Sequence, residues 1–529
     1  MGRDPGFARG KGAGGAALSG PPAAKLLAIV AELLRESQPA GGTPPVPALA
    51  SSLERDLGID SLARVELLLR IERAFDVRLP EHLLGAAETP RDLLEAVLAG
   101  APRVREAAAA AAPLALPAAE AAHPADAATL LEALDWHSAR HADRTHLVIL
   151  GDAEGAEERV TYGELRREAL AVAAGLAQRG IGAGQAVSIM LPTGRDFFRA
   201  FLGILLAGAV PVPIYPPTRW AQIEDHLRRQ AKILANCRAV MLVTLDEGKR
   251  VAHVMQGLVP TLASVATVAD LALPGVVPLL PKARAGDLAL LQYTSGSTGD
   301  PKGVMLTHAN LLANIRAMAR AVDAGPSDVF VSWLPLYHDM GLIGAWMGGL
   351  YAGFPLVVMP PTAFLNRPSR WLRAVHRYRA TFSAGPNFAY EIAATRIDER
   401  DLEGLDLSAW RIAFNGAEPV SPGTIERFAK RFAPYGLRRE AITPVYGLAE
   451  CAVGLAFPPI GRGPRIDRVR RAALTTSGSA VASADDDRDS LRFVGCGEPL
   501  PGHEIRVVSP EGRELPERME GRIEFRGPS

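Results

Sequence analysis

The chain has 529 residues, 48% of them hydrophobic and 22% charged, which is typical of a globular protein and allows more than one domain. Its 58 Lys and Arg balance its 58 Asp and Glu, so no overall field favours a nucleic acid partner or an anionic membrane. Three scattered cysteines form no CxxC pair, which argues against a disulfide framework or a zinc site and fits the reducing cytoplasm.

Nothing in the sequence predicts secretion or stable membrane insertion. The N-terminus has no apolar stretch of the kind found in signal peptides. The most hydrophobic run, Phe201 to Ile214, is too short to span a bilayer and contains two prolines. We therefore expect a cytoplasmic protein.

The first 100 residues predict a small helical domain. Residues 1–20 are expected to be disordered. The residues that follow hold apolar side chains at helical spacing. Helical segments are expected at 24–36, at about 62–75, around Leu83-Leu84 and around Leu93-Leu94. They predict an all-α four-helix bundle over residues 21–100.

A change of composition separates this domain from the rest. Residues 101–125 are mostly Ala and Pro, which predicts a linker. Over residues 126–529, β-rich runs alternate with helical stretches, the α/β pattern of layered, mostly parallel sheets with helices. Among these runs, strands are expected at 187–191, 240–244, 329–333 and 356–359.

The most informative stretch runs from Tyr293 to Val304 and reads YTSGSTGDPKGV. It follows an apolar run and gathers glycines and hydroxyl side chains around Lys302. In such a loop, backbone N–H groups reach phosphate oxygens where no Cβ interferes, hydroxyls donate, and the lysine adds positive charge. The P-loop motif is excluded, because Pro301 precedes the lysine and Gly303 follows it. A flexible surface loop is the alternative.

Further motifs follow along the chain. They are VTYGEL from Val160, GILLAGAVPVP from Gly203, LPLYHDMGL from Leu334, NGAEP from Asn415, YGLAE from Tyr446 and GEPLPG from Gly497. Together with the glycine-rich stretch, they resemble the adenylate-forming enzymes, the superfamily of acyl-CoA ligases, peptide-synthetase adenylation domains and fatty acyl-AMP ligases. The resemblance covers residues 126–529 and implies a large α/β adenylate-forming (AMP-binding) domain. It also implies activation of a carboxylate by ATP, giving an acyl-adenylate and pyrophosphate.

The resemblance implies roles for individual residues. Those expected to hold the ATP phosphates are Thr294, Ser295, Gly296, Ser297, Thr298, Gly299 and Lys302. Those expected to hold adenine and AMP are Gly416, Ala417, Glu418, Tyr446 and Gly447. The expected catalytic residues are Lys302, Glu450, His338 and Thr294.

Two of these residues have alternative interpretations. Glu450 is the expected Mg²⁺ ligand, since a hard cation takes carboxylate oxygens beside substrate phosphates. The alternative is a solvated surface glutamate. His338 resembles the residue near the carboxylate-binding site, and a structural histidine is the alternative.

Several features favour the fatty acyl-AMP ligase branch. The Phe-Asp-x-Ser stretch of amino-acid adenylation domains is absent, and Ala449 stands where acyl-CoA ligases usually carry threonine. The segment of residues 451–494 is longer than the corresponding segment of CoA ligases, and fatty acyl-AMP ligases carry an insertion there. A tolerated surface loop would also explain that length. Residues 364–368 and 384–391 resemble the same branch.

The N-terminal domain carries a second chemistry. Ser61 lies in LERDLGIDSL, at the expected start of the second helix, where the helix dipole stabilises an attached phosphodiester. An ordinary helix cap formed by Asp60 is the alternative. The surroundings resemble an acyl carrier protein, which implies a 4′-phosphopantetheine arm on Ser61, added by a phosphopantetheinyl transferase. Arg64, Arg70 and Arg73 make its recognition helix less acidic than those of fatty-acid carriers, which favours partners from a modular assembly line.

The resemblances together predict a loading unit. A fatty acid and ATP would give acyl-AMP, and the acyl group would pass to the thiol of its own or a downstream carrier. A ketosynthase or condensation module of polyketide, lipopeptide or lipid biosynthesis would follow. Measured against the family pattern, the sequence ends inside a motif at Ser529, so the C-terminal lid subdomain is expected to be missing.

Two competing hypotheses remain. One is an acyl-CoA or aryl-acid ligase with an appended carrier. The other is a non-catalytic carrier or scaffold fragment, which the expected loss of the lid supports.

Overall fold

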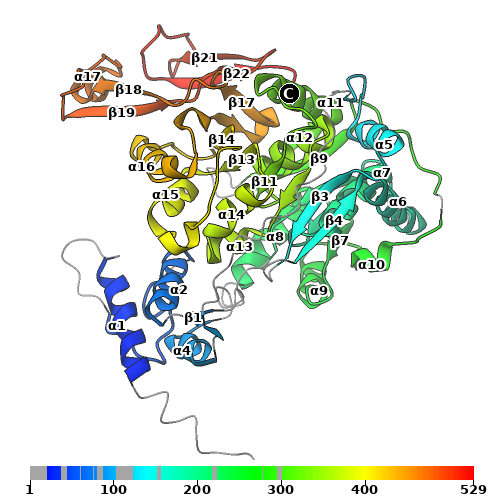
Figure 1. Cartoon of the computed structure of the whole chain (residues 1–529). Coiled ribbons are helices and arrows are strands. Elements are labelled where there is room, and N and C mark those ends of the chain that lie inside the picture. The colour runs from blue at the N-terminus through cyan, green and yellow to red at the C-terminus, as the bar shows by residue number, and fades with distance from the viewer. Residues whose placement is uncertain are drawn as a thin grey trace, which may run out of the picture. The chain divides into compact units, whose positions relative to one another are not determined.

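The computed structural model contains two compact units, one built mainly from residues 1–107 and one mainly from residues 108–529 (Figure 1). The structure describes residues 21–36, 45–59, 61–75, 77–79, 87–99, 101–102, 123–151, 156–216, 223–276, 278–294 and 301–529. Within these ranges, no helix combines the length and the apolar character needed to span a bilayer.

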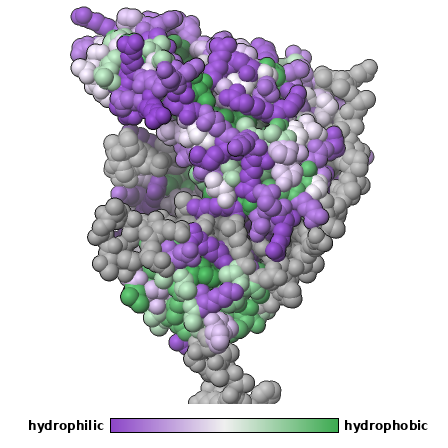
Figure 2. Space-filling view, turned by 60° about the vertical axis from the view of Figure 1, so that its left-hand side comes forward, coloured by the Kyte–Doolittle hydropathy of each residue, from purple (hydrophilic) through white to green (hydrophobic). Residues whose placement is uncertain are grey.

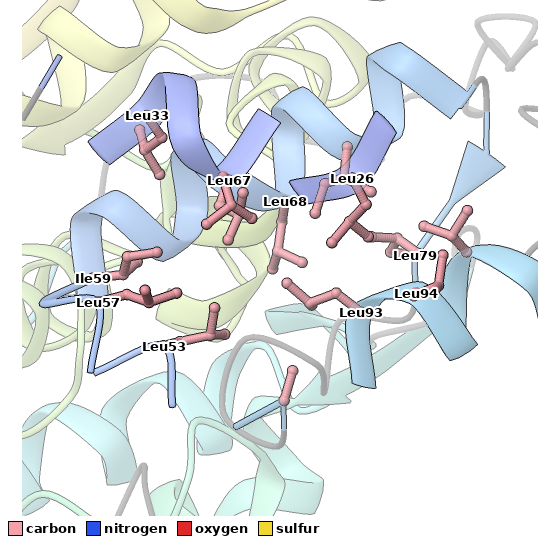
Figure 3. Close-up of a cluster of buried hydrophobic side chains, with 14 of the residues drawn as sticks. Leu26, Leu33, Leu53, Leu57, Ile59, Leu67, Leu68, Leu79, Leu93 and Leu94 are labelled. Carbon is pink, nitrogen blue, oxygen red and sulfur yellow. The ribbon is translucent and has the colours of Figure 1, made fainter. Parts of the chain in front are cut away.

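The first unit is organised around three described helices. They are α1 (Pro21–Glu36), α2 (Ser61–Phe75) and α4 (Pro90–Ala99). Figure 3 shows leucines of all three helices pointing into one apolar core, among them Leu26, Leu33, Leu67, Leu68, Leu93 and Leu94. Three residues of the connection between α1 and α2, Leu53, Leu57 and Ile59, fill the same core. The helices expected over 24–36, over 62–75 and around Leu93-Leu94 are therefore present.

Two features of this unit fall outside the sequence-based expectation. The element expected around Leu83-Leu84 lies outside the described residues. A short antiparallel pair joins β1 (Val77–Arg78) to β2 (Ala101–Pro102). Runs of two residues carry no recognisable strand pattern, which is why the sequence does not predict this pair.

Two sheets dominate the second unit (Figure 1). The seven-stranded sheet has the order β15 (Ile442–Pro444), β14 (Ile412–Asn415), β13 (Phe382–Gly385), β11 (Phe330–Ser332), β12 (Leu356–Val358), β3 (Thr145–Leu150) and β4 (Glu157–Thr161). The four-stranded sheet has the order β6 (Val210–Pro213), β5 (Ala186–Met190), β7 (Met241–Thr244) and β8 (Ser264–Ala266). All neighbours are parallel except β3 and β4.

The strands expected from the sequence are β5, β7, β11 and β12, and all four are buried along their whole length. Because strands of a parallel sheet are covered on both faces, they read as unbroken apolar runs. That pattern is what made them predictable. The two large sheets are mostly parallel, as expected, whereas the smaller sheets of this unit are antiparallel.

Helices cover these sheets. The α-helices are α5 (Leu130–Arg140), α6 (Tyr162–Gln178), α7 (Arg195–Leu206), α8 (Ile223–Asn236), α9 (Lys249–Leu258), α10 (Val268–Leu271), α11 (His308–Ala321), α12 (Gly348–Ala352), α13 (Pro361–Asn366), α14 (Ser369–Arg377), α15 (Asn387–Arg396), α16 (Pro422–Phe432) and α17 (Arg471–Ser477). A π-helix, η3 (Met340–Met347), leads directly into α12. Short 3₁₀ turns are η4 (Glu399–Leu402), η5 (Ala433–Tyr435), η6 (Arg439–Ala441) and η7 (Ala449–Cys451).

Antiparallel pairs complete this unit. They are β9 (Leu288–Thr294) with β10 (Lys302–Thr307), β16 (Tyr446–Leu448) with β17 (Val453–Phe457) and β20 (Glu498–Pro499), β18 (Arg465–Arg470) with β19 (Ser490–Gly495), and β21 (Glu504–Val508) with β22 (Arg522–Arg526).

The long segment of residues 451–494 is folded. It contains β18, α17 and most of β19, and β18 pairs with β19 along its whole length. Arg471 Nε lies 3.0 Å from Asp489 Oδ1, and Arg468 Nε lies 3.4 Å from Asp485 Oδ1. The upper part of the face in Figure 2 is largely hydrophilic, in keeping with these ion pairs.

The residues just before α5 are held by an arginine of α11. Arg316 on α11 donates from Nη2 to the carbonyl oxygens of Ala125 at 2.9 Å and Ala127 at 2.6 Å. Its Nε also donates to the Tyr351 hydroxyl at 3.1 Å, on α12. The chain is therefore attached to α11 and α12 just before α5 begins.

Candidate active site

Thr294 and Lys302 face each other at the loop end of a hairpin. β9 ends at Thr294, β10 begins at Lys302, and the two residues are Cα partners in the ladder. The loop residues Ser295, Gly296, Ser297, Thr298 and Gly299 lie outside the described residues. A strand follows the loop where a P-loop would open a helix, in agreement with the exclusion of that motif.

A cavity of about 510 Å³ opens beside this hairpin. The residues that line it include seven of those expected from the sequence, namely Thr294, Lys302, His338, Ala417, Tyr446, Gly447 and Glu450. They come from four separate parts of the chain, so the fold brings them together. Such a cavity, with a few convergent polar groups in a mostly apolar wall, is the usual form of a small-molecule site.

Gly416 and Glu418 flank Ala417 without lining the cavity. Glu418 Oε1 accepts from the backbone N–H of Phe388 at 2.6 Å, which directs that carboxylate toward the start of α15. A Cβ on Gly416 would lie 3.0 Å from the carbonyl oxygen of Val445, so glycine permits a close approach there. Only the neighbour Ala417, which has a φ of 67°, faces the cavity.

Glu450 presents its carboxylate to the cavity from the 3₁₀ turn η7. The residue is exposed, and within the described part of the chain no side chain pairs with its carboxylate. No cluster of three or more metal-ligating side chains occurs among the described residues. A cation held by Glu450 would therefore take its other ligands from substrate oxygens and water, as Mg²⁺ commonly does. The residues present fit a Mg²⁺ bound together with phosphates.

His338 forms an ion pair with its neighbour in the chain. Its Nδ1 lies 2.7 Å from Asp339 Oδ1, and both residues line the cavity. Partial burial favours the neutral ring, but the Asp339 carboxylate outweighs it and holds the pKa of His338 above the ordinary value of 6.5. The imidazole side chain is half exposed, 53% by area, so a ligand in the cavity would reach it.

Most of the remaining wall is apolar. The lining contains Ile315, Met318, Ala319, Val322, Phe330, Gly344, Gly348, Phe354, Phe382, Ala384, Phe414, Val445, Val453 and Phe457. The phenyl rings pack on one another, with 6.4 Å between the centroids of Phe330 and Phe414. A Cβ on Gly344, in η3, would meet no atom within 4 Å, so this residue faces open space.

The sequence did not predict this apolar wall. Its members include residues of α11, η3, α12, β17 and three strands of the large sheet, and apolar residues on such elements are expected to serve the core. The one available signal was the pair Gly344 and Gly348 within an otherwise apolar helical stretch. A π-helix at this place, often found at functional sites, cannot be recognised from residue spacing.

A second cavity, of about 280 Å³, adjoins the first. It shares Thr294, His338, Asp339 and Ala449 with the first. Tyr215, Arg229, Gln292 and Tyr337 contribute polar groups to it.

In the first unit, Ser61 is the first residue of α2, as expected. The backbone that leads to Ser61 is anchored by Leu57 and Ile59, which are buried on either side of Gly58. Gly58 has a φ of 66°, which favours glycine, and the N–H of Ile59 donates to the carbonyl oxygen of Leu53 at 2.8 Å. Asp60, the expected cap, lies outside the described residues.

Two family models match the chain. The model of AMP-binding enzymes matches residues 134–529, and the model of the phosphopantetheine attachment site matches residues 24–97. The chain therefore belongs to the family of AMP-binding enzymes and carries an N-terminal carrier domain. The expectation of a large α/β adenylate-forming domain preceded by a carrier is confirmed.

Curated relatives narrow the branch. The medium-chain-fatty-acid–acyl-carrier-protein ligase JamA of Moorena producens (strain JHB) is 34% identical over 398 residues, covering 72% of this chain and 65% of that protein. The long-chain-fatty-acid–AMP ligase FadD26 of Mycobacterium marinum (strain ATCC BAA-535 / M) is 35% identical over 369 residues, covering 68% and 62%. The chain thus spans just under two thirds of the length of these relatives.

Solved structures of fatty acyl-adenylate ligases are similar to this chain. One from studies of fatty acyl-adenylate ligases of E. coli and L. pneumophila has a TM-score of 0.72 and 33% identity, covering 77% of this chain and 73% of that one. The fatty acyl-adenylate ligase from L. pneumophila in complex with acyl adenylate and pyrophosphate has a TM-score of 0.70 and 31% identity, covering 77% and 70%.

Proposed function

We propose that this protein activates a fatty acid with ATP and passes the acyl group to a phosphopantetheine thiol. One observation carries the proposal: a single cavity is lined by Thr294, Lys302 and Glu450 on one part of its wall and by packed phenyl rings on another. The first group suits phosphates and a cation, and the second suits an alkyl chain. An acyl-adenylate has both parts in one molecule.

The first half-reaction joins the two substrates. A carboxylate oxygen of the fatty acid attacks the α-phosphorus of ATP, the bond from that phosphorus to the bridging oxygen breaks, and pyrophosphate leaves. Lys302 would balance phosphate charge, and Glu450 would hold Mg²⁺, which supplies further charge neutralisation. The ion-paired imidazole of His338 would attract the fatty acid carboxylate. Ala417, Tyr446 and Gly447 would contact the adenylate. Gly416 and Glu418 would hold the backbone next to Ala417 in place.

The second half-reaction transfers the acyl group. The bond between the acyl carbon and the phosphate oxygen of AMP would be exchanged for a thioester bond to a phosphopantetheine thiol, and AMP would be released. In this proposal residues 21–100 are the carrier, 101–125 the linker and 126–529 the adenylation domain. Ser61 would carry the arm after modification by a phosphopantetheinyl transferase.

Fatty acids are the proposed substrate class because most of the described lining is apolar, and its buried carboxylate, Asp339, is already paired with His338 and so is not free for an amino group. The names of the relatives JamA and FadD26 support the same class. In the proposed pathway, a ketosynthase or condensation module takes the loaded acyl group.

Fatty-acid-dependent exchange between ATP and labelled pyrophosphate tests the first half-reaction. Exchange should appear with saturated fatty acids and be absent with amino acids or benzoates. Adding free coenzyme A or a phosphopantetheinylated carrier then separates the acceptors. Acyl transfer to the carrier without acyl-CoA formation supports the proposal, and efficient acyl-CoA formation would favour a CoA ligase.

The carrier in the same chain is the proposed acceptor. A flexible chain as long as the proposed linker 101–125 would have a root-mean-square reach of roughly 25–30 Å, and tethering of this kind gives effective concentrations on the order of millimolar. Loading within one chain should proceed at a rate per molecule that does not change on dilution. A mixture of Ser61→Ala and Lys302→Ala proteins, which must react between chains, should slow on dilution. Equal slowing of the wild type would show that transfer occurs between molecules.

A further inference from the structure

The turn that follows Glu450 is strained. Ala452 has a φ of 60° and Val453 a φ of 128°, both in the region that favours glycine. For Val453 the strain is greatest, because its branched side chain crowds the backbone. Two consecutive strained residues persist only where the surrounding structure holds them. The contacts of this turn therefore determine where the neighbouring carboxylate lies.

One buried side chain holds the end of this turn. Asn314, on α11, is fully buried. Its Nδ2 donates to the carbonyl oxygen of Gly454 at 2.7 Å, and its Oδ1 accepts from the N–H of Gly454 at 3.0 Å. A single amide thus pairs with both backbone groups of the residue after the strained pair. Nδ2 also donates to Ser529 Oγ at 3.3 Å.

The glycine in this pair allows the backbone to approach α11 closely. A Cβ on Gly454 would lie 2.7 Å from Met318 Sδ, one turn along α11 from Asn314. On the other side of the turn, a Cβ on Gly447 would lie 1.7 Å from the carbonyl oxygen of Val453. The turn is therefore confined between α11 and β16.

A further contact ties the residue next to Glu450 into the same network. Cys451 is buried, and its Sγ donates to the carbonyl oxygens of Leu448 at 3.3 Å and Gly454 at 3.5 Å. The carbonyl oxygen of Gly454 thus accepts from both Asn314 and Cys451. Among the described residues Glu450 has no such partner, so its position depends on the backbone that carries it.

We propose that Asn314 is a positioning residue for the metal site. By pairing with Gly454 it maintains the strained turn of residues 450–454, and so directs the Glu450 carboxylate toward Thr294 and Lys302. This inference rests on the proposed function, because it takes Glu450 as the Mg²⁺ ligand. Partners behind a metal ligand commonly change metal affinity by about 10–100-fold when removed.

Calorimetric titration of the whole chain with ATP, in MgCl₂ and separately in EDTA, tests this role without relying on catalysis. The dissociation constant in EDTA divided by that in MgCl₂ measures how strongly Mg²⁺ supports nucleotide binding. In Asn314→Leu this ratio should fall about tenfold toward one, as in Glu450→Gln. ATP binding in EDTA should change little in either variant.

A double-mutant cycle distinguishes positioning from general stability. If Asn314 acts through Glu450, the double variant should show the same ratio as Glu450→Gln alone. Both substitutions would then remove the same contribution of Mg²⁺ to ATP binding. Leu311→Ala, another buried site on α11 that does not line the cavity, is the matched control. It should lower the melting temperature and leave the ratio unchanged. Asn314→Ser, which leaves room for a bridging water, provides a milder variant should Asn314→Leu not fold.

The outcomes are distinguishable. A wild-type chain that binds ATP equally with and without Mg²⁺ would overturn the proposed function, and this inference with it. A normal wild-type ratio that survives both Asn314 substitutions would overturn the positioning role alone. The positioning role would also be overturned if the double variant showed the sum of the two single-variant reductions in Mg²⁺-dependent binding free energy.

Discussion

His338 Nδ1 lies 2.7 Å from Asp339 Oδ1, and both residues line both cavities. This pairing holds the pKa of His338 above 6.5 even though partial burial acts in the opposite direction. The imidazolium form therefore persists to higher pH than in a free histidine, and it is the form that attracts a carboxylate.

The first prediction concerns pH. The KM for the fatty acid should be lowest below the raised pKa of His338 and should rise as pH increases through it. Asp339→Asn removes the cause of the upward shift and leaves burial, so the rise should begin at lower pH. His338→Asn should flatten the profile. A profile that stays unchanged in Asp339→Asn would show that this ion pair does not control substrate binding.

The second prediction concerns the phosphate and metal residues. Lys302→Ala and Glu450→Gln should each lower pyrophosphate exchange by about 100-fold or more, because preorganised charge is lost. Both side chains are exposed, so melting temperatures should stay close to that of the wild type. Lys282→Ala, at another exposed lysine, is the control and should remain active. If the Lys302 and Glu450 variants keep wild-type exchange, these assignments are wrong.

The third prediction concerns chain length. Gly344→Leu fills open space in the cavity, so the KM for long fatty acids should rise about tenfold or more while shorter acids are still activated. Gly344→Ala should have a smaller effect in the same direction. On α9, a Cβ at Gly257 also meets no atom within 4 Å but faces solvent, so Gly257→Leu is the matched control. An unchanged chain-length profile in Gly344→Leu would place the alkyl chain elsewhere.

The fourth prediction concerns the carrier. Incubation with coenzyme A and a broad-specificity phosphopantetheinyl transferase should add one arm to the wild type and none to Ser61→Ala, measured by intact mass. Ser51→Ala, in the same unit, should be modified normally. A wild-type chain that stays unmodified would contradict the carrier assignment.

The fifth prediction concerns acid stability. His146 is buried beneath the stacked ring of Tyr162, and neither of its ring nitrogens has a hydrogen-bond partner among the described residues. Burial, with a smaller contribution from His137, lowers its pKa to about 3. Between pH 6.5 and about 3 the unfolded chain therefore binds more protons, so stability falls as pH decreases.

His146→Phe keeps the ring stack and removes the titrating group. Its melting temperature should depend less on pH than that of the wild type between pH 6.5 and 4. His253→Gln, on an exposed face of α9, should behave as the wild type. Equal acid dependence in wild type and His146→Phe would assign the acid sensitivity to other groups.

The sequence predicted those parts of the molecule that depend on local pattern. The buried strands β5, β7, β11 and β12 read as unbroken apolar runs. Phosphate binding by the loop between Thr294 and Lys302 remains a prediction. Gly416 and Glu418 show the limit of motif-based assignment. They belong to the same motif as Ala417, but the backbone turns them away from the cavity.

The rest depends on tertiary structure. Phe330, Phe382 and Phe414 form part of the cavity wall only because neighbouring strands lie in register. Asn314 is 140 positions from Gly454, and no local pattern relates them. Val453 begins β17 with a φ of 128°, which contradicts the preference of a β-branched residue and could not be read from the sequence.

Binding of a stable acyl-adenylate mimic tests most directly whether one cavity holds both the nucleotide and the alkyl chain. The suitable probe is 5′-O-(N-decanoylsulfamoyl)adenosine, titrated into the wild-type chain by calorimetry beside adenosine, decanoate and the phenylalanyl analogue. We expect the joined molecule to bind far more tightly than either half or the phenylalanyl analogue, with the preference reduced in Gly344→Leu. Binding no tighter than that of adenosine alone would contradict the assignment of this cavity to fatty acid activation.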